Sequence, residues 1–188
     1  MKIYEDIENY VPFNEQEKRD REFILNFLGN NPDAFFRSNT IAHMTASAWC
    51  VNGDRSKVLM VYHNIFDSWS WTGGHADGDE DLFHVALKEL CEETGIKSPK
   101  ALSNSIYSLE VLTVDGHEKR GEYLSSHLHL NVTYLFEADE EEKLRVCDGE
   151  NSAVRWFELQ QALTVPSEKW MAERIYKKLN EKLKIIKK

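Results

Sequence analysis

No apolar stretch in this 188-residue sequence approaches the roughly 20 residues that a membrane-spanning helix needs. The first residues, MKIYEDIENYVPF, are acidic and contain no apolar core, so they do not resemble a secretory signal. These two absences predict a cytoplasmic protein that has no membrane partner.

Cysteine is also scarce. Only Cys50, Cys91 and Cys147 occur, and no two of them have the spacing of a metal-binding pair. An odd number of widely spaced cysteines does not suggest a disulfide framework, so we expect three reduced thiols.

Positive charge is in deficit, with 23 Lys and Arg against 32 Asp and Glu and a formal net charge of -9. The lysines near the C-terminus form the one basic cluster, and there we expect a solvated helix end. A nucleic acid polymer is therefore excluded as a partner, because its phosphates require a basic surface. A small phosphorylated substrate is compatible with this charge, provided that a metal cation supplies the missing positive charge.

Hydrophobic residues are abundant enough for a core, at 41% of the sequence. The length suggests one domain with a small extension. A helix is predicted over residues 14–28, where Asn14 is a suitable N-cap. We interpret residues 1–40 as an N-terminal helical cap and residues 41–188 as the main domain, a single compact unit.

The main domain mixes strand and helix patterns. Strands are predicted at residues 43–51, 57–63, 105–114, 127–136 and 153–159. A turn at Asn52-Gly53-Asp54 is expected to join the first two strands in a hairpin. A helix is predicted over 80–94, and Pro166 and Ser167 open a C-terminal helix. Residues 115–126 are expected to be a polar loop. This irregular alternation favours an α+β fold, with a mixed sheet covered by helices.

Three glutamates, Glu89, Glu92 and Glu93, fall on one turn of the helix predicted over 80–94. Like charges at this spacing repel, and the end of a helix disfavours negative charge. A solvated acidic face is one explanation. The other is a divalent cation such as Mg²⁺, which prefers oxygen ligands. The preceding Gly73 and Gly74 favour a cation, because glycine lets the backbone approach a ligand closely.

Residues 74–96 resemble the signature of the Nudix hydrolases. That signature is Gly, five residues, Glu, seven residues, Arg-Glu, an aliphatic residue, any residue, Glu-Glu, any residue, Gly and an aliphatic residue. Here Gly74 and Glu80 are followed by KELCEETGI at 88–96, so Lys88 replaces the usual Arg and every other defined position matches. The segments TASAW, GGHADGDEDL and HLHLNV extend the resemblance over roughly residues 20–185.

The resemblance implies an α/β/α sandwich and metal-dependent hydrolysis. The substrate would be a nucleoside diphosphate linked to another moiety, cleaved at its diphosphate linkage with Mg²⁺ or Mn²⁺. Glu89, Glu92 and Glu93 would be metal ligands together with the Gly73 carbonyl, and Glu89 would be well placed to activate water. Glu80 and Lys88 would pair to orient Glu89, although Lys lacks the planar fork of Arg.

Other residues carry weaker signals. His127 and His129 alternate on a strand and so face the same way; they are candidates for substrate contact, for packing or for zinc, although the sequence places no third zinc ligand. His75 is a candidate phosphate contact. Trp69 and Trp71 suit base stacking or core packing. The resemblance also suggests a further carboxylate from a downstream loop, for which Glu118, Glu122 and Glu150 are candidates; simple solvent exposure is the alternative for each.

Two other functions share this fold. A nucleotide-binding sensor without turnover is the alternative to a hydrolase, although a sensor has no need of the full carboxylate set. An isopentenyl-diphosphate isomerase requires an activated cysteine, and Cys50 in a predicted strand has no recognisable partner motif. A homodimer is a reasonable expectation for a protein of this kind.

Overall fold

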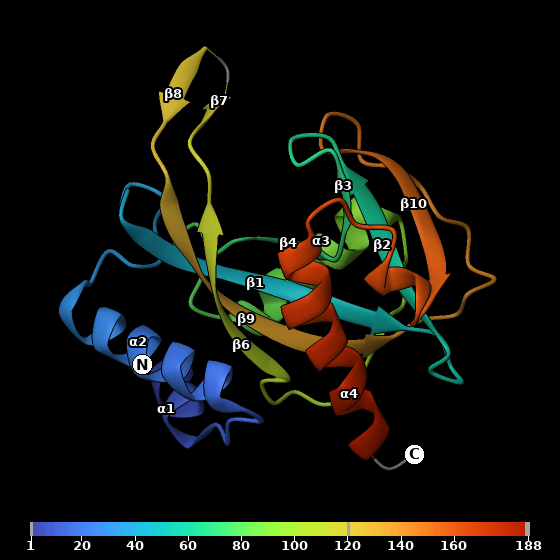
Figure 1. Cartoon of the computed structure of the whole chain (residues 1–188), viewed down its shortest axis with the longest axis horizontal. Coiled ribbons are helices and arrows are strands. Elements are labelled where there is room, and N and C mark those ends of the chain that lie inside the picture. Colours follow the sequence, from blue (N-terminus) through green and yellow to red (C-terminus); the bar gives the residue numbers. More distant parts are fainter. Residues whose placement is uncertain (1, 120, 187–188) are drawn as a thin grey trace.

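An eight-stranded sheet forms the centre of the protein (Figure 1). The computed structural model describes residues 2–119 and 121–186. Five strands follow one another across the sheet: β10 (Asn151–Glu158), β2 (Lys57–His63), β1 (Ala42–Val51), β9 (His127–Glu137) and β5 (Lys100–Ala101). The other three pair at its sides: β3 (Ser68–Ser70) with β2, β4 (Thr72–His75) with β1, and β6 (Ser108–Val114) with β9.

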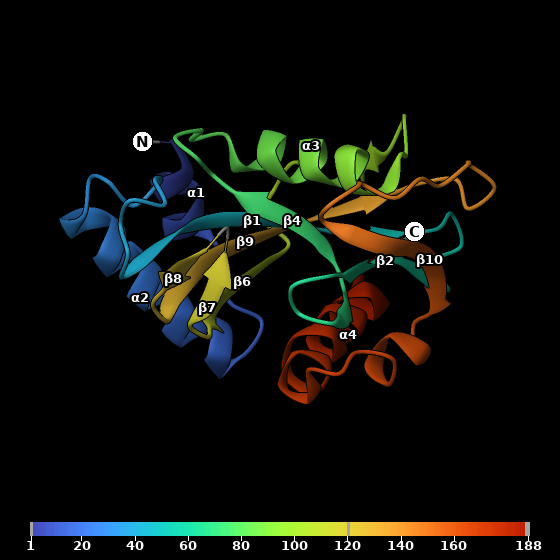
Figure 2. The same cartoon turned by 90° about the horizontal axis from the view of Figure 1, so that it is seen from above.

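The sheet is mixed, as predicted. Strands β1 and β9 run parallel, whereas β1 pairs antiparallel with β2 and β4. Helix α3 (Leu82–Thr94) covers one face of the sheet, and helix α4 (Lys177–Ile185) lies on the other (Figure 2). A π-helical segment, Met171–Tyr176, leads into α4, and a short 3-10 turn, Gln161–Leu163, precedes it. The expected α+β fold with an α/β/α sandwich is therefore confirmed.

Strand β1 separates two apolar clusters, because its alternate residues point to opposite faces. Met44 packs in the cluster beneath α3, whereas Trp49 packs in the cluster beneath α4. Helices α1 (Lys2–Asn9) and α2 (Glu15–Asn30) add Ile7 and Ile24 to the cluster beneath α3. The N-terminal helices thus share the core of the sheet, and the division into a cap at 1–40 and a domain at 41–188 stays a prediction.

The predicted β1–β2 hairpin is present, whereas the expectation for residues 115–126 was wrong. The β1–β2 turn does not place Gly53 in the left-handed region; Arg55 has a φ of 62° there, and Arg55 N donates to Asn52 O. The predicted turn at residues 52–54 therefore joins β1 and β2 in an antiparallel hairpin, within a loop that extends to Lys57 because Val51 pairs with Val58. The expected loop at 115–126 contains a hairpin, β7 (His117–Lys119) and β8 (Glu122–Leu124), which projects from the body in Figure 1.

One lysine of the C-terminal cluster differs from expectation, and Lys187 and Lys188 lie outside the described residues. Lys182 is 8% exposed and pairs with the buried Glu17 at 2.9 Å, so it is not part of a solvated helix end. Lys184 is exposed, as expected. Within residues 2–119 and 121–186, no helix has the length and apolar character that crossing a membrane requires.

Candidate functional site

Helix α3 and the loop before it are fixed by local capping. The Asp81 side chain accepts from His84 N at 3.1 Å and caps the first turn, so the helix begins at Leu82 rather than at residue 80. At the other end Gly95 has a φ of 78°, and its N–H donates to Cys91 O. A left-handed residue at this position favours glycine. Leu90 anchors the buried face of the helix.

The last turn of α3 lies against β4. The carboxylate of Glu93 is buried and accepts from Gly73 N at 2.8 Å. A Cβ added to Gly74 would lie 2.5 Å from Glu89 Cδ, so only glycine allows this approach. Glu92 is exposed on the same turn. The loop and the helix thus bring two of the three signature glutamates onto the Gly73–Gly74 backbone.

Burial perturbs both inner glutamates. It raises the pKa of the Glu93 carboxyl to about 8, and the charges of Glu89 and Glu150 add to this effect although Gly73 N–H opposes it. Burial also raises the pKa of Glu89, against the opposing charge of Lys88. A carboxylate whose charged form is this unfavourable needs either a proton or a cation beside it.

Lys88 contacts the glutamates directly. Its Nζ lies 3.9 Å from Glu89 Oε1 and 3.6 Å from Glu92 Oε2. Among the described residues it forms no ion pair with Glu80, which is exposed in the loop before α3. The expected Glu80–Lys88 pair is therefore not present, because α3 directs Lys88 towards its own last turn.

Glu150 is the downstream acid that reaches this region. Its charge acts on both Glu89 and Glu93. Glu118 and Glu122 lie instead on the β7–β8 hairpin and are exposed.

Three further residues support the glutamate turn, and the sequence analysis assigned a role to none of them. Asn151 Nδ2 donates to Glu93 O at 2.9 Å. Asp77, whose charge acts on Glu89, is held by Arg37 through two hydrogen bonds of 2.7 Å. The aspartate stands in the glycine-rich loop and so had a sequence signal, whereas Arg37 and Asn151 had none.

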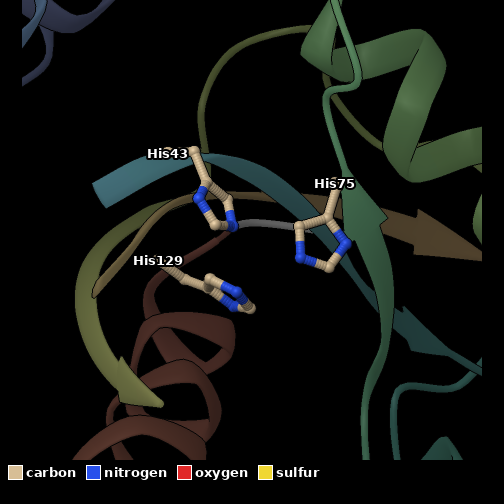
Figure 3. A group of neighbouring side chains, drawn as sticks. All are labelled: His43, His75 and His129. Atoms are coloured by element: carbon tan, nitrogen blue, oxygen red, sulfur yellow. The ribbon is translucent and has the colours of Figure 1, made fainter. Parts of the chain in front are cut away.

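A second group of side chains lies on the other face of β4. His43 on β1, His75 on β4 and His129 on β9 turn their imidazoles towards one another (Figure 3). One ring nitrogen from each lies within 4.8 Å of the others. His127 lies beside them, with its ring centroid 4.9 Å from that of His43. The sequence indicated three of these histidines but not His43, which opens an otherwise apolar strand pattern.

Trp69 and Trp71 pack against aromatic rings of the protein itself. Trp71 is buried and meets Tyr176 edge-on, and Trp69 meets Phe157 in the same way. Cys50 is buried in the core beneath α3, where burial raises the pKa of its thiol. Buried Trp71 is therefore not presented for base stacking, whereas Trp69 is half-buried, and Cys50 is not placed as an activated nucleophile.

Solved structures share this fold at low sequence identity. The NUDIX domain of Shewanella oneidensis NrtR complexed with ADP ribose is 21% identical, with a TM-score of 0.52 over 85% of this chain and 95% of that one. A Nudix hydrolase from M. smegmatis, RenU, is 14% identical, with a TM-score of 0.54 over 78% and 88%. A C. elegans Ap4A hydrolase binary complex is 17% identical, with a TM-score of 0.50 over 75% and 94%.

No protein of curated function matches the sequence. The sequence profile of the NUDIX domain matches residues 42–179. That profile spans the sheet, the glycine-rich loop and helix α3, well over half of the chain. The protein therefore belongs to the Nudix domain family.

Proposed function

We propose that this protein hydrolyses a diphosphate linkage in a nucleoside diphosphate that is joined to another moiety, and that it requires Mg²⁺ or Mn²⁺. The observation that carries the proposal is the position of Glu89 and Glu93, held against the Gly73–Gly74 backbone with raised pKa values. Burial of several neighbouring carboxylates makes their ionisation unfavourable, and a purely structural role does not require it, so this arrangement indicates a functional site.

The residues fit a hard divalent cation. Glu89, Glu92 and Glu93 offer carboxylate oxygens and Gly73 offers a carbonyl, which are the donors that Mg²⁺ and Mn²⁺ accept. When bound, such an ion supplies positive charge to the phosphate oxygens and lowers the pKa of water. The binding of the ion also removes the cost of ionising Glu93, whose pKa of about 8 favours a proton at neutral pH.

The roles of the individual side chains follow from their placement. Glu89 is half-buried beside Gly74 and is proposed as the base that accepts a proton from the attacking water. Lys88, 3.9 Å from Glu89 Oε1, is proposed to orient that carboxylate. Glu80 is proposed to contribute less to catalysis, because its side chain is exposed and does not form an ion pair with Lys88. Glu150 is proposed as the additional acid, supported by its electrostatic effect on Glu89 and Glu93.

Fold neighbours support a nucleotide derivative as substrate. Their names include an Ap4A hydrolase, a dihydroneopterin triphosphate pyrophosphohydrolase and a domain bound to ADP ribose. All three compounds carry a chain of phosphates on a group that contains a heterocycle, which is adenosine in Ap4A and ADP ribose and a pterin in dihydroneopterin triphosphate. We therefore propose the chemical class and leave its individual member to experiment.

A hydrolysis screen tests the proposal. About fifty nucleotide derivatives are incubated with the protein and either Mg²⁺, Mn²⁺ or EDTA, and the products are identified by mass. We expect cleavage of the diphosphate linkage of at least one compound, with turnover lost in EDTA. Tight nucleotide binding by calorimetry without turnover of any compound would contradict hydrolysis and would identify a nucleotide sensor.

Gly74 provides a local test of the geometry. Gly74→Ala places a Cβ 2.5 Å from Glu89 Cδ, which is too close for two carbon atoms, so Glu89 must move away from the β4 backbone. A displacement of about 1 Å in a catalytic group costs roughly 100-fold in rate. We expect a fall of that size in kcat on the substrate that the screen identifies, with the fold retained by circular dichroism.

The matched control is Gly29→Ala on α2. A Cβ at Gly29 meets nothing within 4 Å, so activity is expected to stay unchanged. Full activity in the Gly74→Ala variant would show that the position of Glu89 against β4 is not needed for turnover.

A further inference from the structure

We propose that His43, His75 and His129 form a second metal site, which binds Zn²⁺ through imidazole nitrogens. This inference does not depend on the hydrolase activity proposed above. The three residues come from three different strands that the sheet places side by side. His43 and His129 are paired residues of β1 and β9, and His75 is paired with Thr45 on β1.

The imidazoles are close enough to share an ion. The ring centroids of His43 lie 5.1 Å from those of both His75 and His129, and the His75 and His129 centroids are 4.9 Å apart. One nitrogen from each residue lies within 4.8 Å of the others. Zinc–nitrogen bonds of about 2.1 Å place ligand nitrogens about 3.4 Å apart in a tetrahedron. Rotation of the histidine side chains shortens the nitrogen–nitrogen distances from within 4.8 Å to about 3.4 Å, and it requires no change in the register of the strands.

His43 is oriented as a metal ligand. It is 4% exposed, and its Nδ1 lies 3.0 Å from the carbonyl oxygen of Asn39. A carbonyl only accepts, so Nδ1 carries the proton and Nε2 carries the lone pair. A backbone carbonyl behind a ligating histidine is the usual way in which proteins fix this tautomer. Asn39 is itself held, because its Oδ1 accepts from the backbone N–H groups of residues 41 and 42.

Two of the three rings have a buried nitrogen with no hydrogen-bond partner among residues 2–119 and 121–186. These atoms are His43 Nε2 and His129 Nε2, and both are inaccessible to solvent. Such an atom is costly in an apolar protein interior, since it has lost its hydrogen bond to water. A bound metal ion provides the missing partner for both atoms at once.

The donor set selects the class of metal. Neutral imidazoles suit Zn²⁺ and other transition metals, whereas Mg²⁺ and Ca²⁺ prefer oxygen ligands. Burial and then the neighbouring imidazoles lower the pKa of His129 to about 2, so its ring is neutral at physiological pH. Three protein ligands leave one tetrahedral position for water or for a group of the substrate.

The site is distinct from the glutamate turn. Successive residues of a strand point to opposite faces, and a Cβ at Gly74 would point to Glu89 and α3. A Cβ at Gly73 would instead meet Ser47 Oγ, on the side of β1 that also carries His43. His75 shares that side, so β4 lies between the histidines and the glutamates.

Metal binding by the full-length protein tests this inference. The protein is stripped with chelator and titrated with Zn²⁺ in excess Mg²⁺, followed by calorimetry and elemental analysis. We expect about one zinc ion per chain. Cobalt in place of zinc is expected to give the intense visible bands of a four-coordinate nitrogen site. Both results are expected to persist in the Glu93→Gln variant, which leaves the histidines intact.

Variants locate the ion. His43→Gln and His129→Gln are each expected to weaken zinc binding at least 100-fold and to abolish the cobalt bands. His84→Gln, which alters an exposed histidine on α3, is expected to change neither result. If both cluster variants fail to fold, anomalous difference maps of zinc-soaked wild-type crystals replace them, with a peak expected among the three rings. The proposal is overturned by a wild-type protein that binds no zinc or by zinc located elsewhere.

Discussion

Methionine in place of Lys178 is expected to lower the free energy of unfolding by about 3–5 kcal/mol, because it leaves a buried negative charge without its partner. Lys178 stands on α4 with 2% of its side chain exposed. Its Nζ lies 2.9 Å from Glu110 Oε1 and 3.3 Å from Glu17 Oε1, and both glutamates have fully buried side chains. Methionine retains the apolar stem, so the loss reports mainly on the charge.

The network around Lys178 is closed by further hydrogen bonds. Lys182 Nζ contacts Glu17 Oε1 at 2.9 Å and Tyr10 OH at 2.6 Å. On the other side, Glu110 Oε2 accepts from Asn131 and Thr133 on β9. Burial opposes the ionisation of Glu17, but Lys178, Lys182 and the hydrogen bonds outweigh it and lower the pKa of this carboxyl. The network thus joins α2 and α4 to the sheet through two positive and two negative charges.

Urea denaturation at pH 7 measures the effect. Lys177→Met is the control, because Lys177 is the exposed neighbour on the same helix and is expected to change stability by less than about 0.5 kcal/mol. Adding Glu110→Gln to Lys178→Met is expected to recover part of the loss, since the excess charge is then removed. Equal stabilities for the Lys178→Met and Lys177→Met variants would show that water already solvates these charges.

Local patterns predicted the parts of the molecule that depend on short sequence separations. The glutamate turn, its glycine cap and the loop before it lie within residues 73–96, so spacing alone brought Glu89 and Glu93 to one side of a helix. Strands β1 and β2 were also predictable, because most of their residues are apolar, whereas the short strands β3, β4 and β5 were not predicted. The mixed sheet followed from the irregular order of these elements.

Long-range pairing was not predictable. Lys178 and Glu110 are 68 positions apart, and nothing in KKLNEKLKI distinguishes a buried lysine from an exposed one. His43 was missed for the same reason. Its role depends on the parallel register of β1 and β9, which a single sequence does not reveal. Sequence analysis therefore placed Glu89, Glu92 and Glu93 together on one helical turn, whereas it indicated only separate members of the histidine cluster.

Glutamine in place of Glu93 is expected to reduce kcat about 1,000-fold while leaving the metal-free protein folded and at least as stable at pH 7. The effect on kcat differs from the effect on stability, because turnover depends on the ionised carboxylate of Glu93 and the stability of the metal-free protein depends on its protonated form. Without metal, burial raises the pKa of Glu93 to about 8, so the neutral acid prevails at pH 7 and glutamine imitates it. The glutamine oxygen is also able to accept from Gly73 N, as Glu93 Oε1 does at 2.8 Å.

Turnover needs the charged form that glutamine lacks. A divalent ion stabilises the reacting phosphate by several kcal/mol, and about 4 kcal/mol corresponds to a thousandfold change in rate. Kinetics under saturating Mg²⁺ and thermal unfolding in EDTA measure the two effects, with Glu22→Gln on the exposed side of α2 as the control. Because a merely structural Glu93 would lose stability and activity together, an unchanged kcat, or a loss matched by unfolding, would remove Glu93 from the proposed catalytic site.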